Sequence, residues 1–351
     1  MPTLALSMIV KNAERDLPEC LASVRGVVDE IVIADTGSTD SSVAIARETR
    51  ARAISIGWSD DFAKARNLSL HEVRSDWVLI LDADERLDRA AIRAMPELMS
   101  EPGIAGYQIT IRNYLLDPHR SIWDRPSKPN DGRFPPARKY PAHVDHENIR
   151  LFRRHPDIYF TGRVHETVGW RIRDTHGKIG AATFHIHHFG LACDQETLAR
   201  KIALYRDLGR LKLADMPDNA QAYLEAGMVE LEDLGSPADA LPYLQRACEL
   251  NPKFGMAWFF IAKAQFQAGK YGEVLRSLRE AESVGYINAP AAELAGDVNY
   301  ILEHYDDAAV SYKWALRRTG GSAALEKKAY LAKSGAGKIA SDPPRLLQDA
   351  R

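Results

Sequence analysis

The chain has 351 residues, of which 45% are hydrophobic and 27% charged, and its formal net charge is −2. This composition is typical of a globular protein long enough for two domains, and it argues against nucleic acid or an anionic membrane surface as a partner. The N-terminal apolar stretch LALSMIV is too short for a signal sequence, and no stretch approaches the roughly 18 apolar residues that span a bilayer. Three widely spaced cysteines, Cys20, Cys193 and Cys248, suit a reducing compartment, so we expect a cytoplasmic protein without a transmembrane segment.

The first hundred residues alternate between expected strands and expected helices. Strands are expected at 4–10, 29–35, 51–57 and 76–82, and helices at 13–25, 38–50 and 61–73. Strands separated by helices of this length predict an α/β fold with a parallel sheet, in which ligands bind beyond the carboxyl ends of the strands. Asp35 and the pair Asp82 and Asp84 both fall at that edge.

The acidic pair follows a buried strand in the stretch WVLILDADER, residues 77–86. Because side chains alternate across a strand, we expect Asp82 and Asp84 to project to one side and Ala83 to the other. Two neighbouring carboxylates repel each other unless a cation lies between them, and a hard divalent metal that holds a phosphorylated substrate would supply it. The simpler alternative is a solvated acidic turn.

The composition of the chain changes after the expected strand at 106–116. Residues 117–147 contain six prolines among many charged residues, which indicates either a functional loop or partial disorder. Short strands are expected again at 149–154, 158–168 and 181–190.

The C-terminal part repeats itself with a 34-residue period, in blocks that begin at 221, 255 and 289. Small residues recur in register where two helices must touch, as at Ala247, Ala281 and Ala315. Period and pattern resemble tetratricopeptide repeats, with Pro252 and Trp258 in the expected places. We expect a lead-in helix at 194–217 and a capping helix at 323–334.

Four motifs in order, LSMIVKNAERDLPECLASV, DEIVIADTGSTDSS, DFAKARN and DWVLILDADE, resemble the nucleotide-sugar half of family 2 glycosyltransferases with the GT-A fold. The resemblance covers about residues 4–190. Members that also carry tetratricopeptide repeats include relatives of the peptide S-glycosyltransferases that modify bacteriocins. The expected architecture is a GT-A domain at 1–193, a connecting helix at 194–220, repeats with a capping helix at 221–335 and a tail at 336–351.

The resemblance implies a role for each matching position. Asp35 would recognise a uracil base, Arg66 would face the nucleotide, and Val10, Gly37 and Ala83 would line the same site. Asp82 would contact the ribose or the metal, and Asp84 would coordinate Mn²⁺ or Mg²⁺ against the diphosphate of a UDP-sugar. For Ser38, Thr39 and Asp40, capping of the following helix is the expected role, and for Arg66 a solvated helix arginine is the alternative.

Two further motifs supply candidates for catalysis and metal binding. In GRVHETV, Glu166 would be the base that takes the acceptor's proton; the alternative is a structural ion pair with Arg150, Arg153 or Arg163. In FHIHHFG, related sequences favour His188 as a metal ligand, which would predict a preference for manganese. His185 is expected to be a buried structural histidine.

The sequence thus predicts a metal-dependent, inverting hexosyltransferase that uses a UDP-sugar and modifies a peptide or protein bound by the repeats. Two alternatives remain open: transfer to lipopolysaccharide core or exopolysaccharide, and a scaffold without activity. The repeats could equally mediate a homodimer, and the attacking atom could be oxygen, sulfur or nitrogen.

Overall fold

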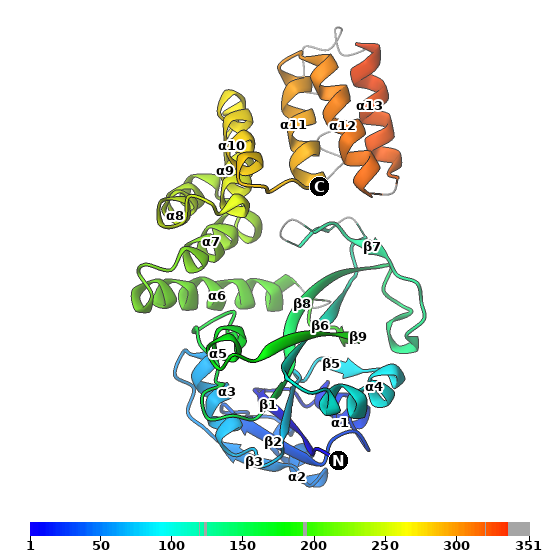
Figure 1. The fold of residues 1–351 in the computed structure, drawn as a ribbon, viewed down its shortest axis with the longest axis vertical. Coiled ribbons are helices and arrows are strands. Elements are labelled where there is room, and N and C mark those ends of the chain that lie inside the picture. The colour runs from blue at the N-terminus through cyan, green and yellow to red at the C-terminus, as the bar shows by residue number, and fades with distance from the viewer. Residues whose placement is uncertain (119, 123–124, 192–194, 320, 336–351) are drawn as a thin grey trace. The chain divides into compact units, whose positions relative to one another are not determined.

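The computed structural model describes residues 1–118, 120–122, 125–191, 195–319 and 321–335. The predicted tail at 336–351, Cys193 and the predicted boundary at 193–194 lie outside the described residues. The chain divides into two compact units, one made of Met1–Ile122 with Pro126–Arg200 and one made of the helices that follow Lys201 (Figure 1).

The first half of the N-terminal unit is a parallel βα arrangement, as the alternating pattern predicts. Its strands, in the order β3-β2-β1-β4, are β1 (Leu4–Val10), β2 (Glu30–Asp35), β3 (Arg52–Ser55) and β4 (Trp77–Ile80). The helices between them are α1 (Leu17–Ser23), α2 (Ser42–Glu48) and α3 (Phe62–His71). Every residue of β4 is buried, which explains its unbroken apolar run.

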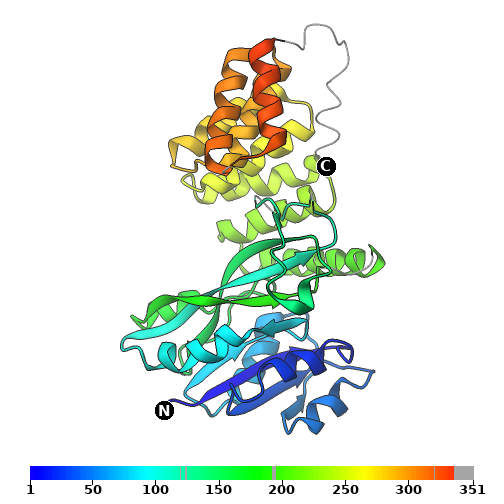
Figure 2. The same ribbon diagram turned by 90° about the vertical axis from the view of Figure 1, so that its right-hand side faces the viewer.

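The second half of the sheet is mostly antiparallel. Its elements are β5 (Glu85–Leu87), α4 (Arg89–Ser100), β6 (Ile104–Leu115), β7 (Lys128–Pro129), β8 (Ala142–Arg153), α5 (Gly169–Asp174) and β9 (Lys178–His188). The sheet continues from β4 in the order β8-β6-β9-β5, with β7 paired to β8. Figure 2 shows the long strands β6, β8 and β9, from cyan to green, running beside one another.

Two expectations for the middle of the chain need correction. The expected strand at 158–168 is not regular, because its only pairing among the described residues is the bridge between Thr161 and Thr167. The stretch at 117–147 is only partly loop: it contains β7, a 3₁₀ turn at Pro135–Ala137 and the start of β8. Aromatic packing holds this turn, since the Phe134 ring stacks on His187 with centroids 3.7 Å apart.

Strand pairing in the second half determines which residues meet at the carboxyl edge of the sheet. β5 follows β4 after a short turn and pairs with the end of β9, so that Glu85 lies opposite His188. The turn that carries Asp82 and Asp84 is therefore held beside the last residues of β9.

The second unit consists of antiparallel helix pairs. After α6 (Gln195–Asp215), the helices are α7 (Ala220–Met228), which continues into a π-helical turn at Val229–Asp233, α8 (Pro237–Leu250), α9 (Gly255–Gln267), α10 (Tyr271–Ser283), α11 (Ala289–Ile301), α12 (Tyr305–Thr319) and α13 (Ala323–Ser334). α8, α10 and α12 begin 34 residues apart, as the repeat period predicts. The expected capping helix coincides with α13.

The positions that recur in the repeats form the helix interfaces. Ala247, Ala281 and Ala315 are fully buried, so the helices of each pair approach closely at a small side chain. Gly235 and Gly269 end the first helix of their repeats with φ of +63° and +73°. The third repeat has Glu303 at this position with φ of +61°, a backbone conformation that favours glycine.

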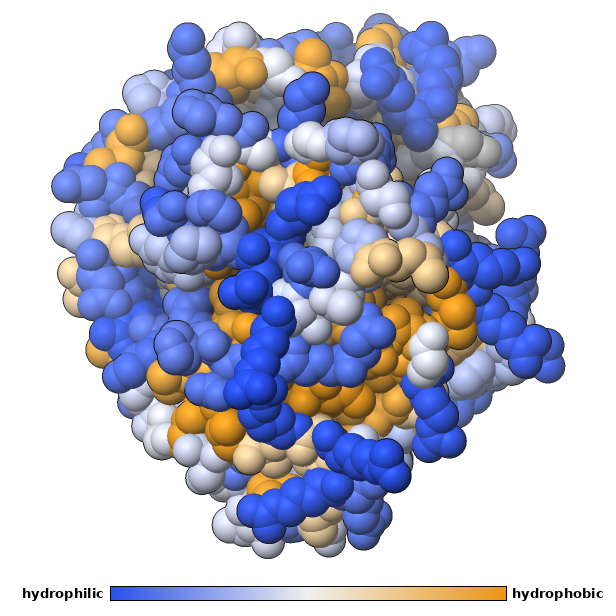
Figure 3. Space-filling view, turned by 60° about the horizontal axis from the view of Figure 1, so that its bottom comes forward, coloured by the Kyte–Doolittle hydropathy of each residue, from blue (hydrophilic) through white to orange (hydrophobic). Residues whose placement is uncertain are grey.

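The face in Figure 3 is largely hydrophilic, with hydrophobic surface gathered in its central part. In the part of the chain that the structure describes, no helix combines the length and the apolar character needed to cross a bilayer.

Candidate active site

Asp82 and Asp84 lie in the turn between β4 and β5, because β4 ends at Ile80. The prediction that both project from one strand is therefore wrong. The turn is closed by two bonds between its ends: the Glu85 N–H donates to the Asp82 carbonyl at 2.9 Å, and the Asp82 N–H donates to the Glu85 carboxylate at 2.8 Å.

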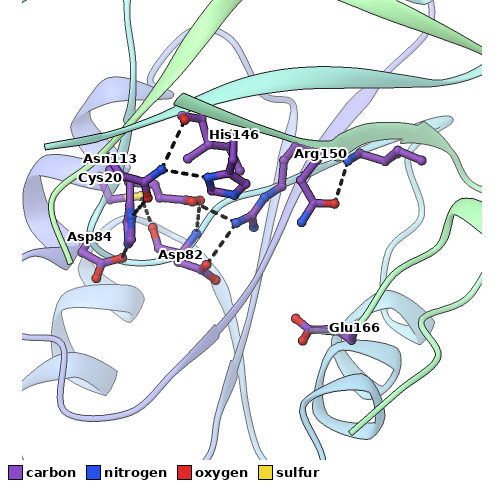
Figure 4. Close-up of polar contacts among 12 residues, drawn as sticks. Cys20, Asp82, Asp84, Asn113, His146, Arg150 and Glu166 are labelled. Atoms are coloured by element: carbon purple, nitrogen blue, oxygen red, sulfur yellow. Dashed lines mark hydrogen bonds and ion pairs between the residues drawn. The ribbon is translucent and has the colours of Figure 1, made fainter. Parts of the chain in front are cut away.

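Two guanidinium groups separate the negative charges at this turn. Arg66 Nη2 lies 2.7 Å from one carboxylate oxygen of Asp82, and Arg150 Nη2 lies 3.3 Å from the other. Burial alone would raise the pKa of Asp82, but the two arginines hold it well below its usual range. Figure 4 shows Arg150 reaching Asp82 from β8.

Arg66 also binds Glu166. Its Nε lies 2.5 Å from a carboxylate oxygen of Glu166, while its Nη2 binds Asp82, so one buried guanidinium bridges the expected base and the acidic turn. The structural ion pair considered for Glu166 exists, but its partner is none of the three arginines expected. Arg66 is a buried bridging residue and not a solvated helix arginine.

Arg150 and Glu85 form a second buried pair, with Nη2 of Arg150 2.9 Å from a carboxylate oxygen of Glu85. Burial raises the pKa of Glu85, the charge of Asp82 raises it further, and Arg150 opposes both. Arg153 points elsewhere, because its guanidinium lies 4.6 Å from the Trp77 ring centroid and its Nε donates to the Ile104 carbonyl.

Asp84 faces His188, with 3.5 Å between its Oδ1 and the Nε2 of the imidazole. Asn113 sets the tautomer of that ring. Its amide nitrogen donates to the Val144 carbonyl at 3.0 Å, so its oxygen is the atom that lies 2.7 Å from Nδ1 of His188. Nδ1 must then carry a hydrogen, so that in the neutral form of the ring the lone pair of Nε2 is directed toward Asp84.

Gly190 leaves room between these two side chains. A Cβ at this position would lie 2.2 Å from Oδ2 of Asp84 and 2.6 Å from Nε2 of His188, so only glycine fits without displacing them. The described residues contain no group of three or more His, Cys, Asp or Glu that could hold a metal ion. A carboxylate and an imidazole lone pair that face each other fit Mn²⁺, provided that diphosphate and water complete its shell.

Asp35 ends β2 and lies buried at the same edge of the sheet. Its carboxylate accepts the backbone N–H of Gly37 at 3.2 Å and that of Ser38 at 3.1 Å, so it holds the turn at Gly37, whose φ is +102°. Val10 ends β1 beside it, and Ala83 lies between the two aspartates of the acidic turn.

The residues after this turn do not all cap α2, contrary to expectation. The helix begins at Ser42. Ser38 accepts the Asn12 N–H, and the Thr39 N–H donates to the Asn12 side chain. Asp40 does bond the Ser42 N–H at 3.0 Å. The turn therefore fastens β2 to the loop after β1.

The histidines of β9 have separate environments. His187 is buried, accepts or donates a 2.8 Å bond with the Tyr114 hydroxyl and lies 3.7 Å from Asp88. His185 is half-buried, and this burial lowers the pKa of its imidazole. For His188, burial alone would lower the pKa, but the Asp84 carboxylate raises it above the ordinary value.

Sequence patterns showed Glu85 as the third acid of the motif but assigned no role to it. They did not single out Asn113 or Gly190, which act through contacts between segments distant in the sequence that no local spacing reveals.

Comparisons with known proteins concern the family of the N-terminal part of the chain. The family model described as Glycosyl transferase family 2 matches residues 6–159. The chain is 31% identical to a TPR repeat-containing protein of Synechococcus elongatus over 63% of this chain and 50% of the relative. It is 34% identical to the lipopolysaccharide core biosynthesis glycosyltransferase LpsC of Rhizobium meliloti, over 33% of this chain and 45% of the relative.

A third relative is the SPbeta prophage-derived glycosyltransferase SunS of Bacillus subtilis, 24% identical over 74% of this chain and 56% of the relative. The chain spans about half the length of these relatives. Among solved structures, S. aureus TarS matches with a TM-score of 0.43 at 14% identity, over 80% of this chain and 55% of that one. Residues 6–159 therefore belong to a glycosyl transferase family 2 domain, and tetratricopeptide-like helical repeats follow it in the chain.

Proposed function

We propose that the chain is a metal-dependent, inverting glycosyltransferase that moves a hexose-type sugar from a UDP-sugar to a peptide or protein. The observation that carries the proposal is the facing pair Asp84 and His188, 3.5 Å apart, at the sheet edge where Asp82 and Glu166 converge on Arg66. Asp84 and His188 would hold Mn²⁺ or Mg²⁺, which would neutralise the diphosphate as it leaves.

In this reaction the acceptor's nucleophilic atom attacks C1 of the sugar from the face opposite the diphosphate. The bond between C1 and the diphosphate oxygen breaks as the new bond forms, and UDP leaves with both electrons. Glu166 takes the proton of the acceptor, and Arg66 keeps its carboxylate next to the acidic turn. Asp35, with Val10, Gly37, Arg66 and Ala83 nearby, would bind the nucleotide.

The first experiment measures thermal unfolding with UDP and Mn²⁺, alone and together. We expect stabilisation that requires both, and we expect it to vanish in Asp84→Ala and to persist in the control Asp157→Ala, an exposed carboxylate. Equal behaviour of the two variants would contradict the metal role of Asp84.

The acceptor class needs a separate test. A helical repeat array suits an extended polypeptide or a second copy of the chain, whereas the match to LpsC favours a lipopolysaccharide core acceptor. Radiolabelled UDP-sugars are incubated with a peptide library and with core oligosaccharide. Label in peptides supports the proposal. Label in the oligosaccharide alone would contradict the peptide acceptor and indicate a saccharide acceptor.

A further inference from the structure

The loop that carries Glu166 has little structure of its own. Its ends are joined at Thr161 and Thr167, whose backbone N–H groups each donate to the other's carbonyl at 3.0 and 3.1 Å. Between them, Gly162 and His165 have positive φ, +95° and +52°. This closure fixes the shape of the loop, but its orientation toward the acidic turn must come from other contacts.

Helix α3 supplies those contacts along one side. At its first turn, the Phe62 N–H donates to the Arg163 carbonyl at 2.8 Å. One turn later, Arg66 binds the Glu166 carboxylate itself. The next residue, Asn67, binds the chain just before the loop.

Asn67 bonds both backbone groups of a single residue. Its Nδ2 donates to the Phe160 carbonyl at 2.9 Å, and its Oδ1 accepts the Phe160 N–H at 2.8 Å. Only an amide offers a donor and an acceptor in this arrangement, so aspartate or alanine cannot reproduce it. The Phe160 side chain is buried among apolar residues, which leaves its backbone little freedom once both bonds are made.

We propose that Asn67 is a positioning residue for catalysis: it fixes Phe160, and thereby the loop that aims Glu166 at the acceptor. This inference rests on the proposed function, because it assumes that Glu166 takes the acceptor's proton. A displacement of about 1 Å of a catalytic group costs on the order of 100-fold in rate. Among the described residues, the side chain of Asn67 bonds only Phe160 and no residue of the acidic turn, so donor binding should be spared.

The test uses acceptor-free hydrolysis of UDP-glucose, UDP-N-acetylglucosamine and UDP-galactose with Mn²⁺, in which water is the nucleophile. The variants are Asn67→Ala, Asn67→Asp, Glu166→Gln and the double variant Asn67→Ala/Glu166→Gln. The control is Leu68→Ala, an exposed neighbour on α3. Circular dichroism verifies folding, and Asn67→Asp, which keeps the size and the acceptor atom, serves if Asn67→Ala does not fold.

We expect Asn67→Ala to lower kcat about 10- to 100-fold with little change in KM for the donor, and Leu68→Ala to match the unchanged protein. In the Glu166→Gln background, the alanine substitution should cause no further loss. If the rate losses of Asn67→Ala and Glu166→Gln multiply in the double variant, the inference is overturned while the proposed function stands. The same holds if Asn67→Ala is as active as Leu68→Ala. Full activity of Glu166→Gln would contradict both the role of Glu166 as the base and the role of Asn67 in positioning it. Absence of turnover with all three donors in the unchanged protein, both with water and with the peptide library, would overturn the proposed function, and this inference with it.

Discussion

The side-chain oxygen of Asn113 lies 2.7 Å from Nδ1 of His188, while its nitrogen contacts the Val144 carbonyl and Nδ1 of His146. One buried amide on β6 therefore orients the imidazole at the end of β9. Partners of this kind, one bond away from a ligand, determine the orientation and basicity of a metal-binding histidine.

The first prediction concerns this amide. Asn113→Ala should weaken Mn²⁺ binding about 10- to 100-fold, because the His188 ring loses its fixed tautomer. Calorimetric titration of the protein with Mn²⁺ in the presence of UDP measures the change. Asn148→Ala on β8 is the control, since Asn148 bonds the adjacent Ile149 N–H. Unaltered affinity in Asn113→Ala would show that His188 does not depend on this bond for metal binding.

The second prediction concerns the bridge made by Arg66. Arg66→Ala should lower the free energy of unfolding by about 3 kcal/mol, because Glu166, whose side chain is 12% exposed, and the partly buried Asp82 would lose this charged partner. Arg66→Lys should be nearly as harmful, since one ammonium group cannot copy a fork that reaches two carboxylates. Thermal unfolding is the measurement, and the exposed Arg173→Ala is the control. A lysine variant as stable as the unchanged protein would mean that charge alone suffices.

The third prediction is a pH dependence at Asp145. Burial alone would raise the pKa of this carboxyl, but His143 and Arg112 hold it well below its usual value. A lowered folded-state pKa stabilises the protein above the unfolded-state value of about 4, and this contribution is lost as the pH falls from there toward the folded-state pKa.

Asp145→Asn should therefore lower the melting temperature at pH 7, and the difference from the unchanged protein should shrink below about pH 4. Melting curves from pH 7 to pH 3 provide the measurement. Asp157→Asn, whose carboxylate is 63% exposed, should have little effect at any pH in that range. A difference that stays constant with pH would show that the lost contribution is not ionic.

The fourth prediction follows from the repeat register. Glu303 has a φ of +61° at the position where the two preceding repeats have glycine. Glu303→Gly should stabilise the protein by up to about 1 kcal/mol, because glycine adopts this conformation without steric cost. Glu326→Gly, in the first turn of α13, should instead destabilise it by a similar amount. Chemical unfolding monitored by helical circular dichroism compares the two, and destabilisation by both would contradict the prediction.

Local patterns predicted much of the fold because its signals are local. Buried strands such as β4 need continuous apolar runs, and each helix pair needs a small residue at its crossing, so both appear in short stretches of sequence. The expected strand at 158–168 was wrong because its buried apolar residues belong to a loop, which forms hydrogen bonds with α3 and not with another strand.

The site was predictable only in part for a related reason. The motif pattern favoured Asp84, His188 and Glu166 as functional residues, and the structure places them at one end of the N-terminal sheet. The motif pattern did not predict that Arg66 would join Glu166 to Asp82, or that Asn113 would orient His188. These contacts depend on strand order, with β8 between β4 and β6, which no single segment encodes.

The absence of a side chain at Gly190 has a practical consequence. A methyl group there would push apart Asp84 and His188 without altering the chemistry of either. Gly190→Ala would thus keep every ionisable group of the protein while it displaces the carboxylate of Asp84 and the imidazole of His188. Such a variant separates the effect of side-chain position from that of charge when the binding of UDP with Mn²⁺ is measured.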